Sequence, residues 1–116
     1  MVVDRLDDAN VDRVFAALAD ATRRDIVARV MHQETSVSGL ARNYAMSFAA
    51  VQKHVAVLER AGLVSKTRRG REQIVRGDVD TIRAAARLLG RFEDLWRDRI
   101  GRLEGVLGEP IGGEAP

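Results

Sequence analysis

Basic side chains that could contact phosphate are concentrated in one stretch of this chain, residues 47–76. Seven lysines and arginines stand there against two acids, a net charge of +5 in a chain whose formal net charge is +2, so the other residues sum to −3. Binding to a phosphate backbone requires a cationic surface of this kind. The charge pattern therefore predicts nucleic acid as the partner. The seven cations are Lys53, Arg60, Lys66, Arg68, Arg69, Arg71 and Arg76.

The residue types that serve covalent catalysis and transition-metal binding are scarce. The chain has no cysteine, and its two histidines, His32 and His54, stand 22 positions apart. It also lacks the glycine patterns that bind nucleotide phosphates or a dinucleotide. Because there is neither a thiol nucleophile nor a cluster of metal ligands, the sequence predicts no enzyme, no metal site and no cofactor.

The totals fit one small domain. The 116 residues leave room for one modest core. No apolar run approaches the ~18 residues of a membrane span, and the acidic N-terminus lacks the basic and apolar regions of a secretory signal. We therefore expect a cytoplasmic location without membrane contact. We assign residues 1–9 to a flexible N-terminus, 10–107 to the functional domain, and the Gly- and Pro-rich residues 108–116 to a disordered tail.

Apolar periodicity predicts four short helices before the basic hairpin, at about residues 10–19, 21–32, 38–44 and 47–61. Asp20, Ser38 and Ser47 stand where N-caps are needed, and Gly62 stands where the fourth helix should end. The second helix would bury Ile26, Val27 and Val30 and leave Arg23, Arg24 and Arg29 in solvent. The fourth helix would bury Val51, Val55 and Leu58.

Two β-prone segments, 63–67 and 73–76, flank the sequence Arg68-Arg69-Gly70-Arg71, whose glycine supplies a turn position. A helix opened by Asp78 or Asp80 then runs to about Leu107, with apolar residues three and four positions apart over roughly seven turns. Four helices, a hairpin and a long helix predict a mostly α (α+β) fold. The specific architecture is a winged helix-turn-helix with a two-stranded β-wing and a long C-terminal dimerisation helix.

Three motifs carry a family resemblance. Residues 17–24, ALADATRR, resemble the ALADPTRR signature of the ArsR-type winged-helix repressors. Residues 47–64 resemble the recognition helix of that family, and residues 91–104 resemble the last helix of a cysteine-free subgroup. The match extends over about residues 10–107. One departure is Ala21, where the family has proline; proline is favourable at a first helical position but is not required there.

The resemblance implies a homodimer in which the first and last helices pack across a two-fold axis. The sequence also favours a dimer, since the apolar face of the last helix is larger than a chain of this size can readily cover. The alternative is that this helix folds back on its own domain. The residues expected at the dimer interface are Val11, Val14, Phe15, Leu89, Phe92, Trp96, Ile100 and Leu103.

The predicted recognition helix offers several side chains to the major groove. The amide of Gln52 can pair with adenine N6 and N7, and Ala49 and Ala50 are small enough to let the helix approach the bases. Phe48 could contact a thymine methyl group or pack on the turn of the motif. Ser47 is expected to cap the helix and to leave neighbouring N–H groups near a phosphate.

The wing and two flanking positions complete the predicted DNA surface. The arginines of the hairpin tip suit the minor groove or the backbone, although a solvated charge run is the alternative. For His54 we expect a structural hydrogen bond or a phosphate contact, and for Lys53 a phosphate or guanine contact. The residues assigned to DNA contact are Ser47, Phe48, Ala49, Ala50, Gln52, Lys53, His54, Lys66, Arg68, Arg69 and Arg71.

The metal-sensing motifs of the resembled family are missing. The predicted third helix has no thiol or imidazole, and the last helix has no histidine. An effector would be an apolar small molecule near Phe92 and Trp96, or a protein, or there is none; core packing is the favoured explanation of these aromatics.

The sequence therefore predicts a sequence-specific, dimeric transcriptional regulator of double-stranded DNA, expected to be a repressor. The 47–61 helix would read an inverted repeat in the major groove, and the 66–73 wing would lie on the flanking backbone or minor groove. The alternative is a protein-interaction module that docks through the long C-terminal helix.

Overall fold

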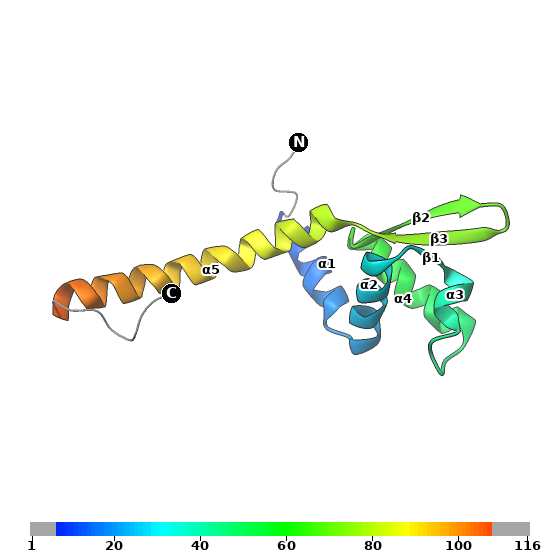
Figure 1. Cartoon of the computed structure of the whole chain (residues 1–116), viewed down its shortest axis with the longest axis horizontal. Coiled ribbons are helices and arrows are strands. Elements are labelled where there is room, and N and C mark those ends of the chain that lie inside the picture. Colours follow the sequence, from blue (N-terminus) through cyan, green and yellow to red (C-terminus); the bar gives the residue numbers. More distant parts are fainter. Residues whose placement is uncertain (1–6, 108–116) are drawn as a thin grey trace. The chain divides into compact units, whose positions relative to one another are not determined.

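The computed structural model describes residues 7–107 (Figure 1). The predicted tail, 108–116, and most of the predicted flexible N-terminus lie outside the described residues. Asp8 and Ala9, the last but one and the last residue of the predicted flexible segment, are the first two residues of a helix. The chain divides into two compact units, with Ala85 the last residue of the first unit and Ala86 the first of the second.

Four helices of the first unit precede the hairpin: α1 (Asp8–Leu18), α2 (Ala21–His32), α3 (Val37–Ala41) and α4 (Phe48–Arg60). The expected caps of α2 and α4 are confirmed, since Asp20 accepts from the Arg23 N–H and Ser47 from the Ala50 N–H. The prediction for α3 was wrong at both ends. Its cap is Ser36 rather than Ser38, and it ends before Tyr44. Gly62 has φ 80°, as expected of a helix-ending glycine.

The hairpin belongs to a three-stranded antiparallel sheet in the order β1-β3-β2, one strand more than predicted. Its strands are β1 (Thr35–Ser36), β2 (Val64–Arg69) and β3 (Glu72–Gly77). The third strand arises because Thr35 and Ser36 pair with Val75 and Ile74. Arg69 pairs with Glu72, so the loop between β2 and β3 has two residues rather than four. Gly70 adopts φ 66° in this loop, a conformation that glycine favours.

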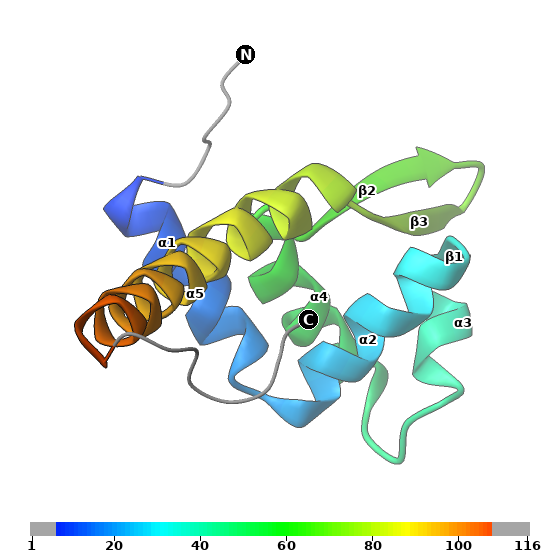
Figure 2. The same ribbon diagram turned by 60° about the vertical axis from the view of Figure 1, so that its left-hand side comes forward.

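The core of the first unit lies where the helices meet. Helix α4 contacts α1, α2 and α3 (Figure 2). The stripe predicted on α4 is confirmed, since Val51, Val55 and Leu58 are completely buried. The stripe predicted on α2 is buried as well. Because α4 is fixed on its inner face by this packing, its outer face is held in one orientation towards solvent.

We expect Leu58→Ala to lower the free energy of unfolding by about 2–5 kcal/mol, because the truncation leaves a cavity in a packed core. Urea denaturation followed by circular dichroism measures this loss. The matched control is Val79→Ala at a site that is 46% exposed, where the change should stay within about 0.5 kcal/mol. Equal effects of the two truncations would contradict the burial of Leu58.

Helix α5 (Val79–Leu107) starts in the first unit and continues through the second. Asp78 rather than Asp80 opens it, since its Oδ1 accepts from the N–H groups of Asp80 and Thr81. The first turns are buried at Thr81, Ala84 and Ala85. Within residues 7–107, no helix combines the length and the apolar character that crossing a membrane requires.

Candidate nucleic-acid interface

The outer face of α4 carries the side chains predicted to enter the major groove. Ala49, Gln52 and Lys53 are exposed, and Phe48 is 46% exposed. Ala50 is half-buried, which places it at the edge of this face. The recognition face therefore points to solvent, opposite to the buried stripe. The contacts of these residues with DNA remain predictions.

The first turn of α4 combines a capped helix end with this exposed face. Ser47 Oγ accepts from the Ala50 N–H at 3.0 Å, so the cap predicted for Ser47 is confirmed. The remaining N–H groups of the turn carry the positive end of the helix dipole, which favours a phosphate at this end. The start of α4 therefore combines backbone N–H groups and the exposed Lys53 side chain on one surface.

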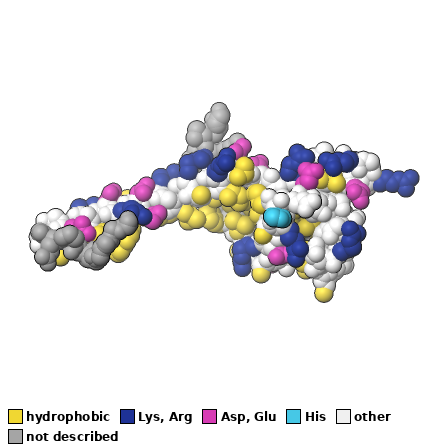
Figure 3. Space-filling view, viewed as in Figure 1, with side chains coloured by type: hydrophobic (Ala, Val, Ile, Leu, Met, Phe, Trp, Pro, Cys, Tyr) yellow, Lys and Arg dark blue, Asp and Glu magenta, His cyan; other side chains and the backbone are white. Residues whose placement is uncertain are grey.

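Ion pairs divide the seven cations of residues 47–76 into two sets. Within residues 7–107, Lys66 pairs with Glu59 at 3.5 Å, and Arg69 and Arg76 both pair with Glu34. The other four have no ion pair in that range, and they are Lys53, Arg60, Arg68 and Arg71. Their charge is available to an anionic partner (Figure 3 shows cationic side chains on the hairpin). The predicted cationic surface is therefore present, although acids partly neutralise it.

The wing arginines differ because neighbouring residues of a strand point to opposite faces. Arg69 and Arg76 share one face, since Arg69 lies opposite Glu72 and Arg76 opposite Ser65 in the register. Glu34 lies within reach of that face. Arg68 points to the other face, where its Nε donates to the Gly70 carbonyl at 3.2 Å. No local pattern in the sequence indicates this role of Glu34, which stands 35 and 42 positions from its partners.

His54 forms a structural hydrogen bond, one of the two alternatives predicted for it. Nη1 of Arg23 lies 3.4 Å from His54 Nδ1. Because a guanidinium group only donates, this contact requires Nδ1 to be the nitrogen without a proton. The same guanidinium donates to the carbonyls of Ala17 and Ala16 at 2.7 and 3.2 Å. Arg23 therefore joins the end of α1 to α4.

The prediction that Arg23 lies in solvent was wrong. A long side chain at a helix start can fold back on the last carbonyls of the preceding helix. Arg23 does so here, on the carbonyls of Ala16 and Ala17. Arg24 behaves similarly, donating to the Leu18 carbonyl at 2.8 Å, although it stays exposed as predicted. Helical periodicity alone does not reveal this use of an arginine.

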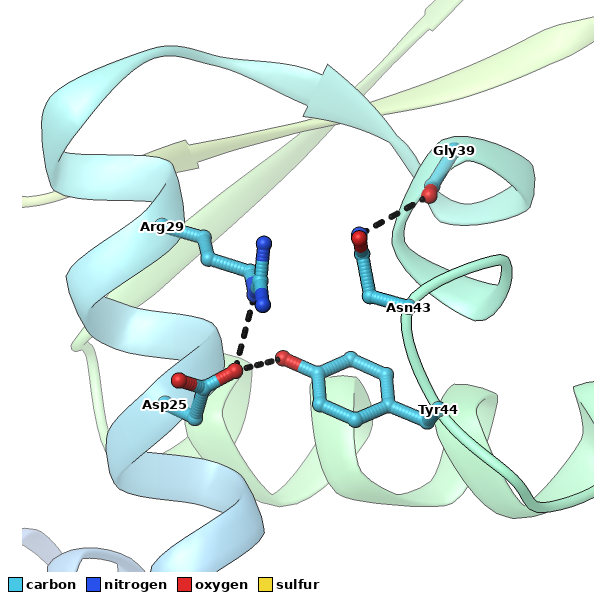
Figure 4. A network of polar contacts seen from close by, with 5 residues as sticks. All are labelled: Asp25, Arg29, Gly39, Asn43 and Tyr44. Carbon is cyan, nitrogen blue, oxygen red and sulfur yellow. Dashed lines mark hydrogen bonds and ion pairs between the residues drawn. The ribbon is translucent and has the colours of Figure 1, made fainter.

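The turn between α3 and α4 is tied to α2 by a polar network that sequence reasoning missed (Figure 4). The Tyr44 hydroxyl donates to Asp25 Oδ2 at 2.5 Å, and Arg29 Nε donates to the same oxygen at 2.8 Å. The Arg29 guanidinium also lies 5.7 Å from the centre of the Tyr44 ring. These contacts fix the turn that positions the recognition helix.

The network shifts the titration of its members in directions that maintain it at neutral pH. The hydrogen bond from Tyr44, and then that from Arg29, lower the pKa of Asp25. Burial, followed by the bond to Asp25, raises the pKa of Tyr44 to about 12. Since the pKa of Asp25 is lower in the folded state, its contribution to stability is present above the unfolded-state pKa. It is lost as the pH falls through the folded-state pKa.

The residues predicted at the dimer interface fall into different environments. Val14 is completely buried in its own chain, so it has no surface to offer a partner, and its assignment to the interface was wrong. Val14 lies on the face of α1 that packs against the core of its own chain. Val11 is half-buried, and Phe15 packs partly against the core of the first unit. In α5, Ile100 is half-buried, and the other predicted positions, Leu89, Phe92, Trp96 and Leu103, are exposed.

Metal ligands are not gathered anywhere in residues 7–107, where no group of three or more His, Asp or Glu side chains could hold an ion. Two acids beside the basic surface, Glu34 and Glu59, pair with arginine and lysine respectively. The arrangement offers cations and amides to an anionic polymer.

Comparisons with known proteins agree with this geometry. The profile of the bacterial regulatory protein arsR family matches residues 20–66. The HTH-type transcriptional regulator Rv2034 of Mycobacterium tuberculosis is 40% identical over 81 residues, which cover 70% of this chain and 76% of the relative. This chain belongs to the ArsR family. It is accordingly a DNA-binding transcriptional regulator, as the sequence predicted.

Solved structures of ArsR-family proteins confirm the fold. An ArsR-like transcriptional regulator from Rhodococcus sp. RHA1 superimposes with a TM-score of 0.75 at 32% identity, covering 89% of this chain and 96% of the other. The winged helix-turn-helix DNA-binding domain Mb0332 from Mycobacterium bovis, described as homodimeric, has a TM-score of 0.62 at 26% identity. The match covers 80% of this chain and 91% of that domain. The ArsR-family fold therefore extends over most of this chain, including the position where Ala21 replaces proline.

Proposed function

We propose that this ArsR-family protein is a homodimeric repressor that recognises an inverted-repeat operator and occludes a promoter. The observation that carries the proposal is the exposed face of α4, where Gln52 and Lys53 lie opposite a fully buried stripe. Such a helix is rigidly held and free to enter the major groove. The wing adds Arg68 and Arg71, which have no ion pair within residues 7–107.

A dimer is supported by the exposed apolar face of α5. Leu89, Phe92 and Trp96 are between 54% and 62% exposed in the single chain. Large apolar patches of this kind mark interaction surfaces. The relative Mb0332 is itself described as homodimeric, and α5 offers a second copy a self-complementary face.

The dimer would place two copies of α4 in successive major grooves, about 34 Å apart on one face of the duplex. If roughly six phosphates are neutralised, the logarithm of affinity should fall with the logarithm of salt concentration with a slope near −5. The wing would contribute backbone or minor-groove contacts beside each half-site. The dimer would thus bind a palindromic site and block access of RNA polymerase to it.

Selection of bound fragments from random duplex DNA by the purified protein tests the proposal. We expect enrichment of an inverted repeat whose half-sites lie about 10–10.5 base pairs apart, centre to centre. The repeat should lie in the promoter that the protein silences in a reporter assay. No enrichment at low ionic strength, or enrichment of a single unpaired half-site, would contradict the proposal.

We expect Gln52→Ala to relax the base preference at one position of each half-site by about 1–3 kcal/mol, because a bidentate amide contact is lost. Stability should be nearly unchanged, since Gln52 is exposed. Lys53→Ala is the matched control. Loss of the Lys53 ammonium group should weaken binding to all sequences. It should also make the salt slope shallower by about 0.9 for each α4, which is the contribution of one phosphate contact.

The measurement for both variants is a fluorescence-anisotropy titration against the selected site, single-base variants of it and an unrelated duplex. If Gln52→Ala instead unfolds the protein, or if it weakens all sequences equally, the helix does not face DNA in the proposed orientation.

A further inference from the structure

Glu34 is the acid that most directly opposes the basic surface of the wing. It precedes β1 and is half-buried, with 36% of its side chain exposed. Its two carboxylate oxygens face two arginines from different strands. Arg69 is the last residue of β2, and Arg76 lies near the end of β3. One carboxylate therefore pairs with two of the seven cations and offsets one of their two charges.

The two ion pairs of Glu34 are unequal. Arg76 binds Glu34 Oε1 through both Nε, at 2.9 Å, and Nη2, at 2.8 Å. Arg69 reaches Oε2 through Nη2 alone, at 3.3 Å. The pKa of Glu34 is lowered, first by the hydrogen bond from Arg76 and then by that from Arg69. Arg76 is thus the more strongly bound partner. Arg69 can leave Glu34 while the carboxylate keeps its ion pair with Arg76.

Arg69 is also the partner closest to the tip of the wing. It adjoins the Gly70-Arg71 loop, and 63% of its side chain is exposed. A guanidinium group binds phosphate more strongly than water. A phosphate oxygen can therefore take the place of a carboxylate oxygen as its hydrogen-bond acceptor. The contact with Glu34 and a contact with DNA would engage the same guanidinium group.

We propose that Glu34 competes with the DNA backbone for Arg69. In the free protein, Arg69 pairs with Glu34. On the duplex, Arg69 binds a phosphate instead of this carboxylate, and Arg76 continues to pair with Glu34. This competition lowers the affinity of the protein for all DNA sequences by the same factor, because phosphate contacts carry no base information. This inference rests on the proposed DNA-binding role of the wing.

The test is a double-mutant cycle on the full chain, with the selected operator and an unrelated duplex as the two probes. We expect Glu34→Gln to raise the affinity for both duplexes, by roughly 2- to 5-fold, the range typical of an exposed ion pair. Arg69→Gln should weaken binding only slightly in the natural background, since Arg69 must first leave Glu34. In the Glu34→Gln background the same change should weaken binding several-fold more.

Glu72→Gln is the matched control, because it removes the same charge from the same face of the wing. Glu72 lies opposite Arg69 in the register, yet it has no ion pair within residues 7–107. Glu72→Gln should raise the affinity for DNA only through the overall electrostatic potential of the protein. Its effect should therefore be additive with that of Arg69→Gln. Coupling to Arg69 is therefore expected for Glu34 and not for Glu72.

Equal coupling of Arg69 with Glu34 and Glu72, or weaker DNA binding by Glu34→Gln, would overturn the proposal. The second result would mean that Glu34 orients the wing for DNA rather than competing with it. Failure of the proposed function has a different signature. In that case the unmodified protein and all variants would bind neither duplex at low ionic strength.

Discussion

Reversal of two wing charges, Arg68→Glu with Arg71→Glu, is expected to reduce DNA affinity by at least about 100-fold and to leave the fold intact. Both side chains are exposed, and neither has an ion pair within residues 7–107. A hydrogen bond to a charged group contributes roughly 1.5–3 kcal/mol, so two lost contacts already correspond to about two orders of magnitude. Repulsion between the new carboxylates and phosphate adds to this loss.

The measurement is anisotropy of a labelled operator duplex over a range of salt concentrations. The salt slope should become shallower as well, because each lost arginine–phosphate contact removes about 0.9 from it. Circular dichroism and sedimentation check that secondary structure and oligomeric state are unchanged. These checks are needed because Arg68 also donates to the Gly70 carbonyl.

Arg91→Glu with Arg102→Glu is the matched control. Both arginines are exposed on α5, and the pair changes the net charge by the same amount. If binding depends on the wing rather than on total charge, this variant should keep nearly all of its affinity. Unchanged DNA retention by the wing variant would instead favour the alternative, in which the protein docks partners through α5 and the basic hairpin is incidental.

The sequence predicted those features that depend on local signals. Asp20 and Ser47 cap helices through the N–H group three residues later, so a short segment contains the whole interaction. The stripe of Val51, Val55 and Leu58 follows from the helical period alone. Consequently the outer face of α4, which is the opposite of this stripe, could also be predicted from the sequence.

The features that the sequence did not predict depend on contacts between distant segments. Thr35 and Ser36 form a strand only because β3 offers a free edge. The bonds from Tyr44 to Asp25 and from Arg76 to Glu34 join residues 19 and 42 positions apart. Val14 was misplaced for a related reason. The stripe of α1 indicates which residues are apolar, but not whether its own chain or a partner covers them.

These long-range contacts have a common effect on the recognition helix. Tyr44 fixes the turn that precedes α4 through Asp25, and Arg23 contacts His54 within α4. Ser47 then fixes the first turn of the helix. The helix is thus held at its start, at its middle and along its buried face. Rigid support of this kind is what the proposed contact of Gln52 with the bases requires, since a mobile helix would average its contacts.

The exposed residues of α5 follow a spacing that is typical of a coiled coil. Leu89, Phe92, Trp96, Arg99, Leu103 and Val106 stand alternately three and four positions apart. A mean interval of 3.5 residues keeps such a stripe on one side of a supercoiled helix. Arg99 does not break the stripe, since its guanidinium lies 5.7 Å from the centre of the Trp96 ring. A second copy of α5 can therefore pack along the same line.

Trp96→Asp should consequently separate the proposed dimer. Central aromatic residues of an interface commonly contribute 2 kcal/mol or more, and a carboxylate buried in their place adds a further penalty. We expect the dissociation constant of the dimer to rise by at least about 30-fold, as measured by sedimentation equilibrium. Because a single subunit binds only one half-site, the salt slope on the operator should fall to about half.

Gly101→Asp is the control for this variant. It introduces the same charge into α5 at a position where an added Cβ has no neighbouring atom within 4 Å. It lies away from the stripe of Leu89, Phe92 and Trp96 on the helix surface. The dimer should therefore persist. If Trp96→Asp leaves the dimer intact, the apolar stripe of α5 does not join two copies of this chain. The half-sites of the operator would then require another explanation for their fixed spacing.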